Sequence, residues 1–276
     1  EAEGRFDDRV AYGGWSMDDH HPAGFNAVRI GAPATIFHHA PSPYGIPYRS
    51  LYSRNIANLM FAGRDASCTH AAMSSARVMG TGCSMGQAVG TAAAMAARMG
   101  ATPRDIGRHI RPLQQALLSD DAYLPGVKYE LPALTAGATL TASQGNPEAL
   151  RDGVHRPVGT DLHAWACRKG DHAEYVWSGS RTVAGVTLIL DSALEKNAQM
   201  SYHQRDDQLL RLPDVMPRAF RVDGLAGGKW VALARVENNH QRLVRFGIGR
   251  ELEGVRFTLD ETRGAESSRV FAFYVG

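Results

Sequence analysis

A long run without a charged side chain constrains the fold of this chain most. It extends from Val78 to Ala97, between Arg77 and Arg98, and consists mostly of Gly, Ala, Thr, Ser and Met. Three glycines repeat in it at the four-residue spacing of closely packed helices: Gly82, Gly86 and Gly90. Leu, Ile and Phe, the residues that favour membrane insertion, are absent from it. We therefore predict a helix packed tightly within a domain, and no membrane span.

Composition excludes several classes of protein. Lys and Arg number 30 against 28 Asp and Glu in 276 residues, so the chain lacks the basic excess that drives nucleic-acid binding. A hydrophobic content of 44% is enough to fill a substantial core. The three cysteines, Cys68, Cys83 and Cys167, are odd in number and widely spaced, so we expect buried thiols rather than a disulfide framework or a zinc site. The first residues are acidic and contain no apolar segment, so we expect no signal peptide, and the location in the cell stays open.

The residue pattern of the first half of the chain predicts a domain with both helices and strands. Residues 1–50 are rich in Gly, Pro, His and aromatic residues without a sustained period, which predicts loops. The apolar run Asn58–Asp65 predicts a short strand that ends in a polar turn. Helical signals dominate residues 71–99, which Gly100 closes, and another helix is predicted over 104–118, with Thr102 as N-cap and Pro103 as the first helical residue.

Beyond about Tyr129 the pattern changes to short β-rich runs separated by Gly, Pro, Asn and Asp turns. The predicted strands are 174–177, 183–190, 230–236, 243–248, 255–259 and 270–275. Many short strands at this spacing make a β-sandwich. The periodicity is interrupted between Leu124 and Ala138, so we predict a first domain over 1–128 and a second over 129–276. The fold class is therefore α+β and multidomain.

A strand, turn and helix in the first domain form the strongest candidate for chemistry. Gly63-Arg64-Asp65 follows the predicted strand, and the charge-free helix has its first turn near Gly80-Thr81-Gly82. A helix N-terminus offers unpaired N–H groups and a partial positive charge, which suit a phosphate or an electron-accepting ring. A helix of small residues that only packs against a sheet is the alternative. The spacing G-x-G-x-x-x-G from Gly80 to Gly86 does not fit the dinucleotide fingerprint, so we do not predict a pyrophosphate loop there.

Histidines form a second candidate cluster: His20-His21, His38-His39 and His70, with Asp18 and Asp19 beside the first pair. Histidine titrates near neutrality, and a neighbouring carboxylate orients it for proton transfer. Adjacent histidines point in different directions and no H-x-x-x-H helix is present, so we predict no metal site. Exposed or structural histidines are the alternative.

Several motifs, taken in order, resemble the C-terminal half of the FAD-dependent oxidoreductases found among bacterial carbohydrate-related enzymes. The motifs are Gly13-Gly14-Trp15 with Asp18 and His20, Ile46-Pro47-Tyr48-Arg49, Asn58–Ser67 with Thr69-His70, Arg77-Val78-Met79, and Gly86-Gln87-Ala88 with Gly90-Thr91-Ala92-Ala93. The resemblance covers about residues 7–115. It implies a partial FAD-binding α/β domain, and hence FAD as the cofactor.

The resemblance also implies roles for individual residues. The cofactor-binding residues would be Gly63, Arg64, Asp65, Ser67, Arg77, Gly80, Thr81 and Gly82, of which the first three approach the phosphates and ribityl chain and Arg77 through Gly82 face the flavin ring. A helix N-terminus would stabilise the negative charge of a reduced flavin. His70 would be the acid/base residue, and Asp18 with His20 a second pair on the substrate side.

Two features depart from the family pattern. Relatives often have proline where this chain has Gly80, which makes the helix start less rigid. The glycine-rich N-terminal fingerprint is missing, so the sequence resembles a C-terminal portion, a processed chain or one member of a split enzyme. We therefore expect an N-terminal FAD-domain portion or a companion chain as a partner.

The second domain resembles galactose-binding-like jelly rolls, including discoidin-type modules. The resemblance rests on Asn146–Gly153, Trp165, Ala173–Trp177 and the terminal Ser267–Tyr274. Trp165, Trp177 and Trp230 could stack against sugar rings, although core tryptophans are the commoner outcome.

These observations predict a flavin-dependent oxidoreductase that acts on a small-molecule or carbohydrate substrate bearing a hydroxyl. One alternative is a carbohydrate-binding or assembly protein on a degenerate scaffold. Another is a polysaccharide-cleaving enzyme that uses the histidine and aspartate cluster.

Overall fold

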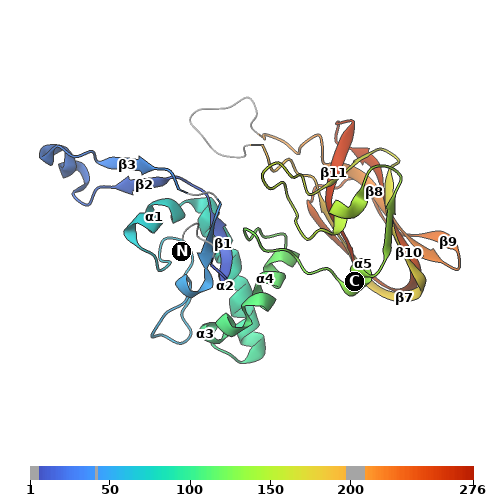
Figure 1. The fold of residues 1–276 in the computed structure, drawn as a ribbon, viewed down its shortest axis with the longest axis horizontal. Coiled ribbons are helices and arrows are strands. Elements are labelled where there is room, and N and C mark those ends of the chain that lie inside the picture. The colour runs from blue at the N-terminus through green and yellow to red at the C-terminus, as the bar shows by residue number, and fades with distance from the viewer. Residues whose placement is uncertain (1–5, 41–42, 197–208) are drawn as a thin grey trace. The chain divides into compact units, whose positions relative to one another are not determined.

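The computed structural model describes residues 6–40, 43–196 and 209–276. The chain divides into two compact units, Glu1–Val127 and Lys128–Gly276, which are described separately. Figure 1 shows helices and short strands in the first unit and long strands in the second.

Unit 1 contains four short strands where the sequence predicts loops. β1 (Arg9–Gly13) pairs antiparallel with β4 (Tyr44–Pro47), and β2 (Met17–His20) pairs antiparallel with β3 (Thr35–His38). The loop prediction is wrong for these segments, because strands of four or five residues are too short to produce a clear period of two.

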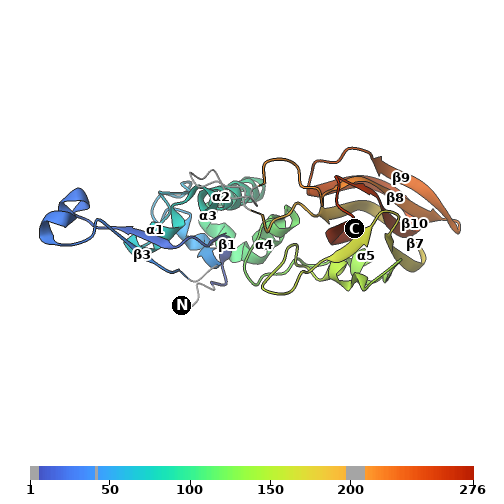
Figure 2. The same ribbon diagram turned by 90° about the horizontal axis from the view of Figure 1, so that it is seen from above.

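The β2–β3 hairpin carries a 3-10 helix, η2 (Gly24–Ile30), between its strands and extends from the rest of the unit (Figures 1 and 2). The apolar side chains of Phe25, Val28 and Phe37 are exposed on this hairpin.

The predicted strand at Asn58–Asp65 forms only an isolated bridge, between Tyr52 and Met60. Two further backbone hydrogen bonds support it: Ser53 N to Leu59 O and Phe61 N to Leu51 O, both at 2.9 Å. The strand prediction is therefore wrong, although the segment is extended and ends in the predicted turn. That turn requires glycine at position 63, where φ is +92°.

Two helices make up the segment 71–99, and the second begins at Met79, near the first turn predicted at Gly80-Thr81-Gly82. α1 (His70–Ala76) begins after Thr69, whose hydroxyl accepts a hydrogen bond from Ala72 N, and α2 (Met79–Met99) follows after a break at Arg77 and Val78. The predicted end is confirmed, because Gly100 has the left-handed conformation of a C-cap. The buried face of α2 consists of Thr81, Met85, Ala88, Ala92 and Ala96. Among the described helices, none has the length and hydropathy needed to cross a bilayer.

The second predicted helix is also interrupted. It consists of α3 (Pro103–Ile106), η4 (Gly107–His109) and α4 (Ile110–Ser119). Its predicted start is confirmed: Thr102 is the N-cap, Pro103 is the first helical residue, and the Thr102 and Asp105 side chains form a reciprocal capping box.

Unit 2 begins with α5 (Ala133–Ala136) and η5 (Pro147–Arg151) and is otherwise built from antiparallel strands. The strands are β5 (Thr139–Ala142), β6 (Trp165–Arg168), β7 (His172–Leu190), β8 (Pro217–Ala226), β9 (Lys229–Val236), β10 (Leu243–Thr262) and β11 (Ser267–Val275). One layer has the order β6-β11-β7-β10, and the other has β5-β7-β10-β8-β9. The long strands β7 and β10 take part in both layers and β10 changes register near Gly247 and Gly254, which confirms the predicted β-sandwich.

The core between the layers contains two of the three tryptophans considered for sugar stacking, which is the commoner outcome expected for tryptophan. Trp165 is 2% exposed and donates from Nε1 to Gln144 O, and Trp177 is 8% exposed and donates to Leu134 O, both at 2.9 Å. Both rings therefore stabilise the core and offer no face to a sugar. The Arg256 guanidinium lies 3.9 Å from the Trp230 ring centroid, so one face of that ring is covered.

Candidate functional site

The candidate site in unit 1 centres on a hydrogen bond between α1 and β2. Nε2 of His70, the first residue of α1, lies 2.7 Å from Oδ1 of Asp19 on β2, although the two residues are 51 positions apart. The His70 side chain is 66% exposed, so a substrate could reach it from solvent. The structure thus gives the predicted acid/base residue a carboxylate partner.

Asp18 points away from Asp19, because successive side chains of a strand alternate between its two faces. Nε2 of His20 lies 3.2 Å from Oδ1 of Asp18. This contact lacks hydrogen-bond geometry, and Oδ1 is shielded from solvent without a donor among the described residues. The predicted pair of Asp18 and His20 is therefore in contact, but its carboxylate has an unsatisfied oxygen.

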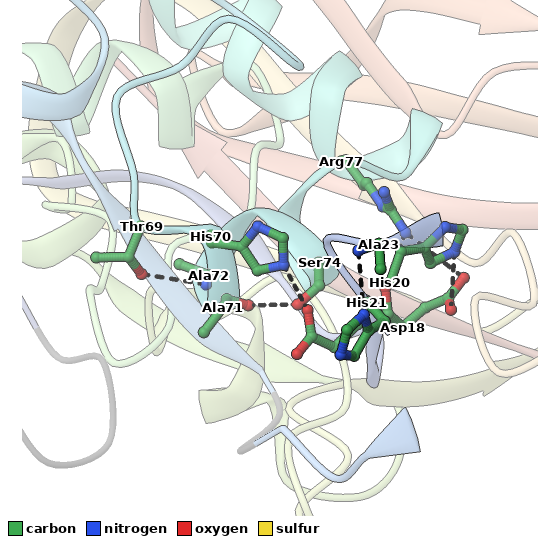
Figure 3. Close-up of polar contacts among 11 residues, drawn as sticks. Asp18, His20, His21, Ala23, Thr69, His70, Ala71, Ala72, Ser74 and Arg77 are labelled. Carbon is green, nitrogen blue, oxygen red and sulfur yellow. Dashed lines mark hydrogen bonds and ion pairs between the residues drawn. The ribbon is translucent and has the colours of Figure 1, made fainter. Parts of the chain in front are cut away.

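Arg77 connects the other end of α1 to the same strand. Its Nη2 donates to the backbone oxygen of Asp18 at 2.8 Å and lies 3.7 Å from Oδ2 of that residue (Figure 3). Both ends of α1 are thus tied to β2, His70 at the start and Arg77 at the C-cap. The Asp18 carboxylate therefore partly neutralises the positive charge of Arg77, the residue that the resemblance places beside the flavin ring.

The two glycine-containing segments predicted to bind the cofactor lie against each other. A Cβ built on Gly82 would lie 3.7 Å from the Cα of Gly63, so the turn at Gly63 rests on the first turns of α2. Ala66 N donates to Gly63 O at 3.2 Å and Ser67 N to Ser50 O at 2.9 Å, which fixes the chain after the turn. Folding therefore joins segments that are 17 to 19 residues apart in the sequence.

The N-terminus of α2 is open. Its N-cap residue, Val78, makes no side-chain capping bond, and a Cβ on Gly80 would meet no atom within 4 Å. Thr81 is buried, so of the predicted trio Gly80 is the residue most open to a ligand. The space beside Gly80 is thus open, and no side chain of the described chain would have to move for a group bound at this helix start.

Arg64 and Asp65 lie on the same turn with exposed side chains. Within the described part of the chain neither side chain has a hydrogen-bond or ion-pair partner. Their predicted contact with the phosphates and ribityl chain stays a prediction.

A cavity of about 460 Å³ lies beside this cluster, within the range of small-molecule sites. Its wall is mostly apolar and includes Met17, which precedes Asp18, and Thr69, which precedes His70. Tyr44 and Ser75 supply polar groups to it: Tyr44 Oη and Ser75 Oγ are 2.5 Å apart, and Ser75 Oγ donates to Trp15 O at 2.5 Å. Because that serine proton is in use, the Tyr44 hydroxyl is the donor to Ser75.

The cysteine prediction needs a correction. Cys68 and Cys83 are exposed and only Cys167 is buried, and all three are free thiols. Cys68 lines the cavity and Cys83 lies on the exposed side of α2. The spacing of cysteines along the sequence therefore does not indicate which of them are buried. Among the described residues, no group of three or more His, Cys, Asp or Glu side chains is arranged to hold a metal ion.

Asp19 belongs to the predicted cluster of histidines and aspartates, but the sequence pattern assigned it no role of its own and did not pair it with His70. Alternation along β2 would have put Asp18 and Asp19 on opposite faces, but it could not identify which face meets α1.

The first part of the chain matches a known family. Residues 1–117 match the sequence profile of a family described as FAD dependent oxidoreductase. This match confirms the resemblance predicted for about residues 7–115.

Similar solved structures include carbohydrate-binding modules. A family 32 module of EndoD from Streptococcus pneumoniae is 12% identical, with 52% of this chain and 97% of that chain covered and a TM-score of 0.39. A family 32 module of NanJ from C. perfringens, solved in complex with galactose, is 10% identical, with 51% and 95% covered and a TM-score of 0.37. Comparison with curated protein sequences gives no match.

Proposed function

We propose that unit 1 is the flavin-facing part of an FAD-dependent oxidoreductase that acts on a carbohydrate or a related hydroxyl-bearing substrate. The observation that carries this proposal is the contact between Gly63 and Gly82 at the open start of α2. The family match over residues 1–117 supports the same chemistry.

The cofactor would lie against two groups of residues. The Gly63-Arg64-Asp65 turn and Ser67 would face the phosphates and ribityl chain, and the first turn of α2 with Gly80, Thr81 and Gly82 would face the ring. The free N–H groups and positive end of a helix suit ring atoms that gain negative charge. Bound FAD would supply a hydride acceptor.

The chain's own residues would handle the proton. His70 is exposed and hydrogen-bonded to Asp19, so it would take the proton of a substrate hydroxyl. Asp18 and His20 form the second candidate pair on the substrate side. The neighbouring apolar cavity would hold an apolar face or substituent of the substrate.

The pyrophosphate loop would come from residues outside the 276 of this chain. Gly80–Gly86 does not have the dinucleotide fingerprint, and no other segment of the sequence supplies one. We therefore propose that an N-terminal FAD-domain portion or a companion chain completes the site.

The test is to isolate the protein with any upstream portion or companion chain and to measure its flavin absorbance and FAD content. Stoichiometric FAD, and its reduction by a hydroxyl-bearing substrate, are expected. The His70→Asn variant should keep its FAD and lose turnover. Absence of flavin from the complete assembly would overturn the proposal, and calorimetric glycan binding without redox activity would favour a carbohydrate-binding protein instead.

A further inference from the structure

The hydrogen bond between His70 and Asp19 defines which ring nitrogen is available for chemistry. An ionised carboxylate only accepts hydrogen bonds, so Nε2 of His70 must carry the proton in the 2.7 Å contact with Asp19. In a neutral imidazole the other nitrogen, Nδ1, then has the free lone pair. Within the described part of the chain, Nδ1 of His70 has no hydrogen-bond partner.

Both partners are held in place by backbone structure. His70 is the first residue of α1, whose start is capped by the hydroxyl of Thr69. Asp19 lies opposite Ile36 in the β2–β3 pairing, and the contact of Arg77 with Asp18 ties the same strand to the end of α1. The Asp19 carboxylate and the His70 ring thus meet because α1 and β2 are fixed relative to each other. A carboxylate held in this way can fix the orientation of the ring.

The two histidines at the end of β2, His20 and His21, lack this arrangement. The contact of His20 with Asp18 does not have hydrogen-bond geometry, and Nδ1 of His21 accepts a hydrogen bond from Ala23 N at 3.1 Å. His70 is therefore the one of these three that combines a carboxylate on Nε2 with an open Nδ1.

We propose that Asp19 is a positioning residue that holds His70 in the Nε2–H tautomer and leaves Nδ1 as the atom that accepts the substrate proton. In that step the substrate O–H bond breaks, its proton bonds to Nδ1, and the electron pair stays on the substrate oxygen. The resulting imidazolium keeps its Nε2–H hydrogen bond to Asp19. This inference rests on the proposed function for the role of the proton, but the tautomer itself does not depend on it.

The tautomer is measured directly by two-bond ¹H–¹⁵N NMR correlation of the histidine rings in the intact, ¹⁵N-labelled protein above the pH at which the ring protonates. His70 is expected to show a protonated Nε2 and an unprotonated Nδ1. His163 is an internal control in which Nδ1 holds the hydrogen bond: it lies 2.6 Å from Oδ2 of Asp152 and should carry the proton, while Nε2 lies 3.7 Å from Oδ2 of Asp161, beyond hydrogen-bond distance. In Asp19→Ala the two tautomers of His70 should both be populated while the His163 signals stay unchanged. A His70 ring protonated on Nδ1, or one that does not respond to the substitution, would overturn the inference.

Activity of the FAD-loaded protein provides the second arm. Asp19→Ala and Asp19→Asn should lower kcat about 10²-fold with little change in KM or FAD content, because misorienting a general base removes much of its typical 10²–10⁴-fold contribution. Asp19→Glu should recover part of the loss. If His70→Asn retains full turnover, the proposed acid/base role is wrong whatever the tautomer. If His70→Asn is inactive but Asp19→Ala keeps full kcat, only the inference about Asp19 is wrong.

Discussion

Gly13 and Tyr44 face each other across β1 and β4, and the phenol of Tyr44 occupies the space that a side chain at position 13 would need. A Cβ on Gly13 would overlap Tyr44 Oη and lie 2.5 Å from Cζ. The same hydroxyl donates to Ser75 on α1, so a glycine on one strand allows a tyrosine to connect the other strand to the helix.

The first prediction follows from this contact. Gly13→Ala should lower the free energy of unfolding of unit 1 by about 1–3 kcal/mol, because the Tyr44 ring must move and lose its bond to Ser75. The free energy of unfolding would be measured by urea denaturation, with Trp15 fluorescence as the signal, in a background in which the other three tryptophans are replaced.

The control for this prediction is a double-mutant cycle with Tyr44→Ala. With the ring removed, Gly13→Ala should cost much less, and the coupling between the two sites should be clearly non-additive. Additive effects would mean that the ring does not require the glycine.

The second prediction separates the helical role of the α2 glycines from a ligand-binding role. Gly80 and Gly90 both face open space, so alanine at either position meets no atom within 4 Å. Gly90→Ala should raise the free energy of unfolding by about 0.5–1 kcal/mol and leave FAD binding unchanged, because alanine is the better helix former. Gly80→Ala should not destabilise the protein but should weaken FAD binding, since it adds a methyl group at the proposed ring face.

Thermal denaturation and FAD titration of the complete assembly test this pair of variants. If both variants bind FAD as tightly as the wild type, no ring lies beside Gly80. If both variants lose FAD affinity to the same extent, the substitutions act through a general effect on α2.

The third prediction concerns the thiols. Burial raises the pKa of Cys167 to about 12, so a maleimide should label Cys68 and Cys83 in the folded protein and reach Cys167 only after unfolding. Cys83 lies one turn beyond Gly80, so formation of the FAD-loaded assembly should slow its labelling. Intact mass of single-cysteine variants gives the rates, and fast labelling of Cys83 in the loaded assembly would contradict the proposed position of the cofactor.

Local signals predicted the helix ends well. The capping box of Thr102 and Asp105 and the C-cap at Gly100 depend on residues within one turn, so the sequence contains all the information they need. The start of α2 at Met79 agrees with the first turn predicted near Gly80, but the separate short helix α1 was not predicted, because both its ends contact β2, which lies far away in the sequence. In unit 2, two predicted strands merge into β7 and two into β10, because each long strand takes part in both layers.

The candidate site was predictable only in part. The resemblance identified His70 and the turn at Gly63, and the histidine cluster included Asp19, but only the structure pairs Asp19 with His70 across β2 and α1. The tryptophans show the same limit, since a ring that could stack on a sugar and a ring that fills a core have the same sequence signal. Only packing distinguished them, with Trp165 and Trp177 buried between the layers of the sandwich.

The fourth prediction is a pH dependence of unit 2 that originates at His155. Burial lowers the pKa of this histidine to about 3, and the positive charges of Arg156 and Arg242 add to the effect. Nε2 of His155 lies 2.9 Å from the hydroxyl of Tyr274, and the rings of Tyr129 and Tyr274 pack beside it.

The neutral form of His155 is the one that the fold stabilises, so its contribution is complete above the unfolded pKa of about 6.5 and is lost as the pH falls towards 3. Between pH 7 and pH 5 the unfolded chain takes up a proton at this position that the folded unit does not. The free energy of unfolding should therefore fall by about 2 kcal/mol more in the wild type than in His155→Gln, which does not titrate. Urea denaturation at several pH values, followed by tryptophan fluorescence in a Trp15→Phe background, restricts the signal to unit 2, where the other three tryptophans lie. Parallel pH profiles for the two proteins would contradict the assignment, because other titrating groups contribute equally to both.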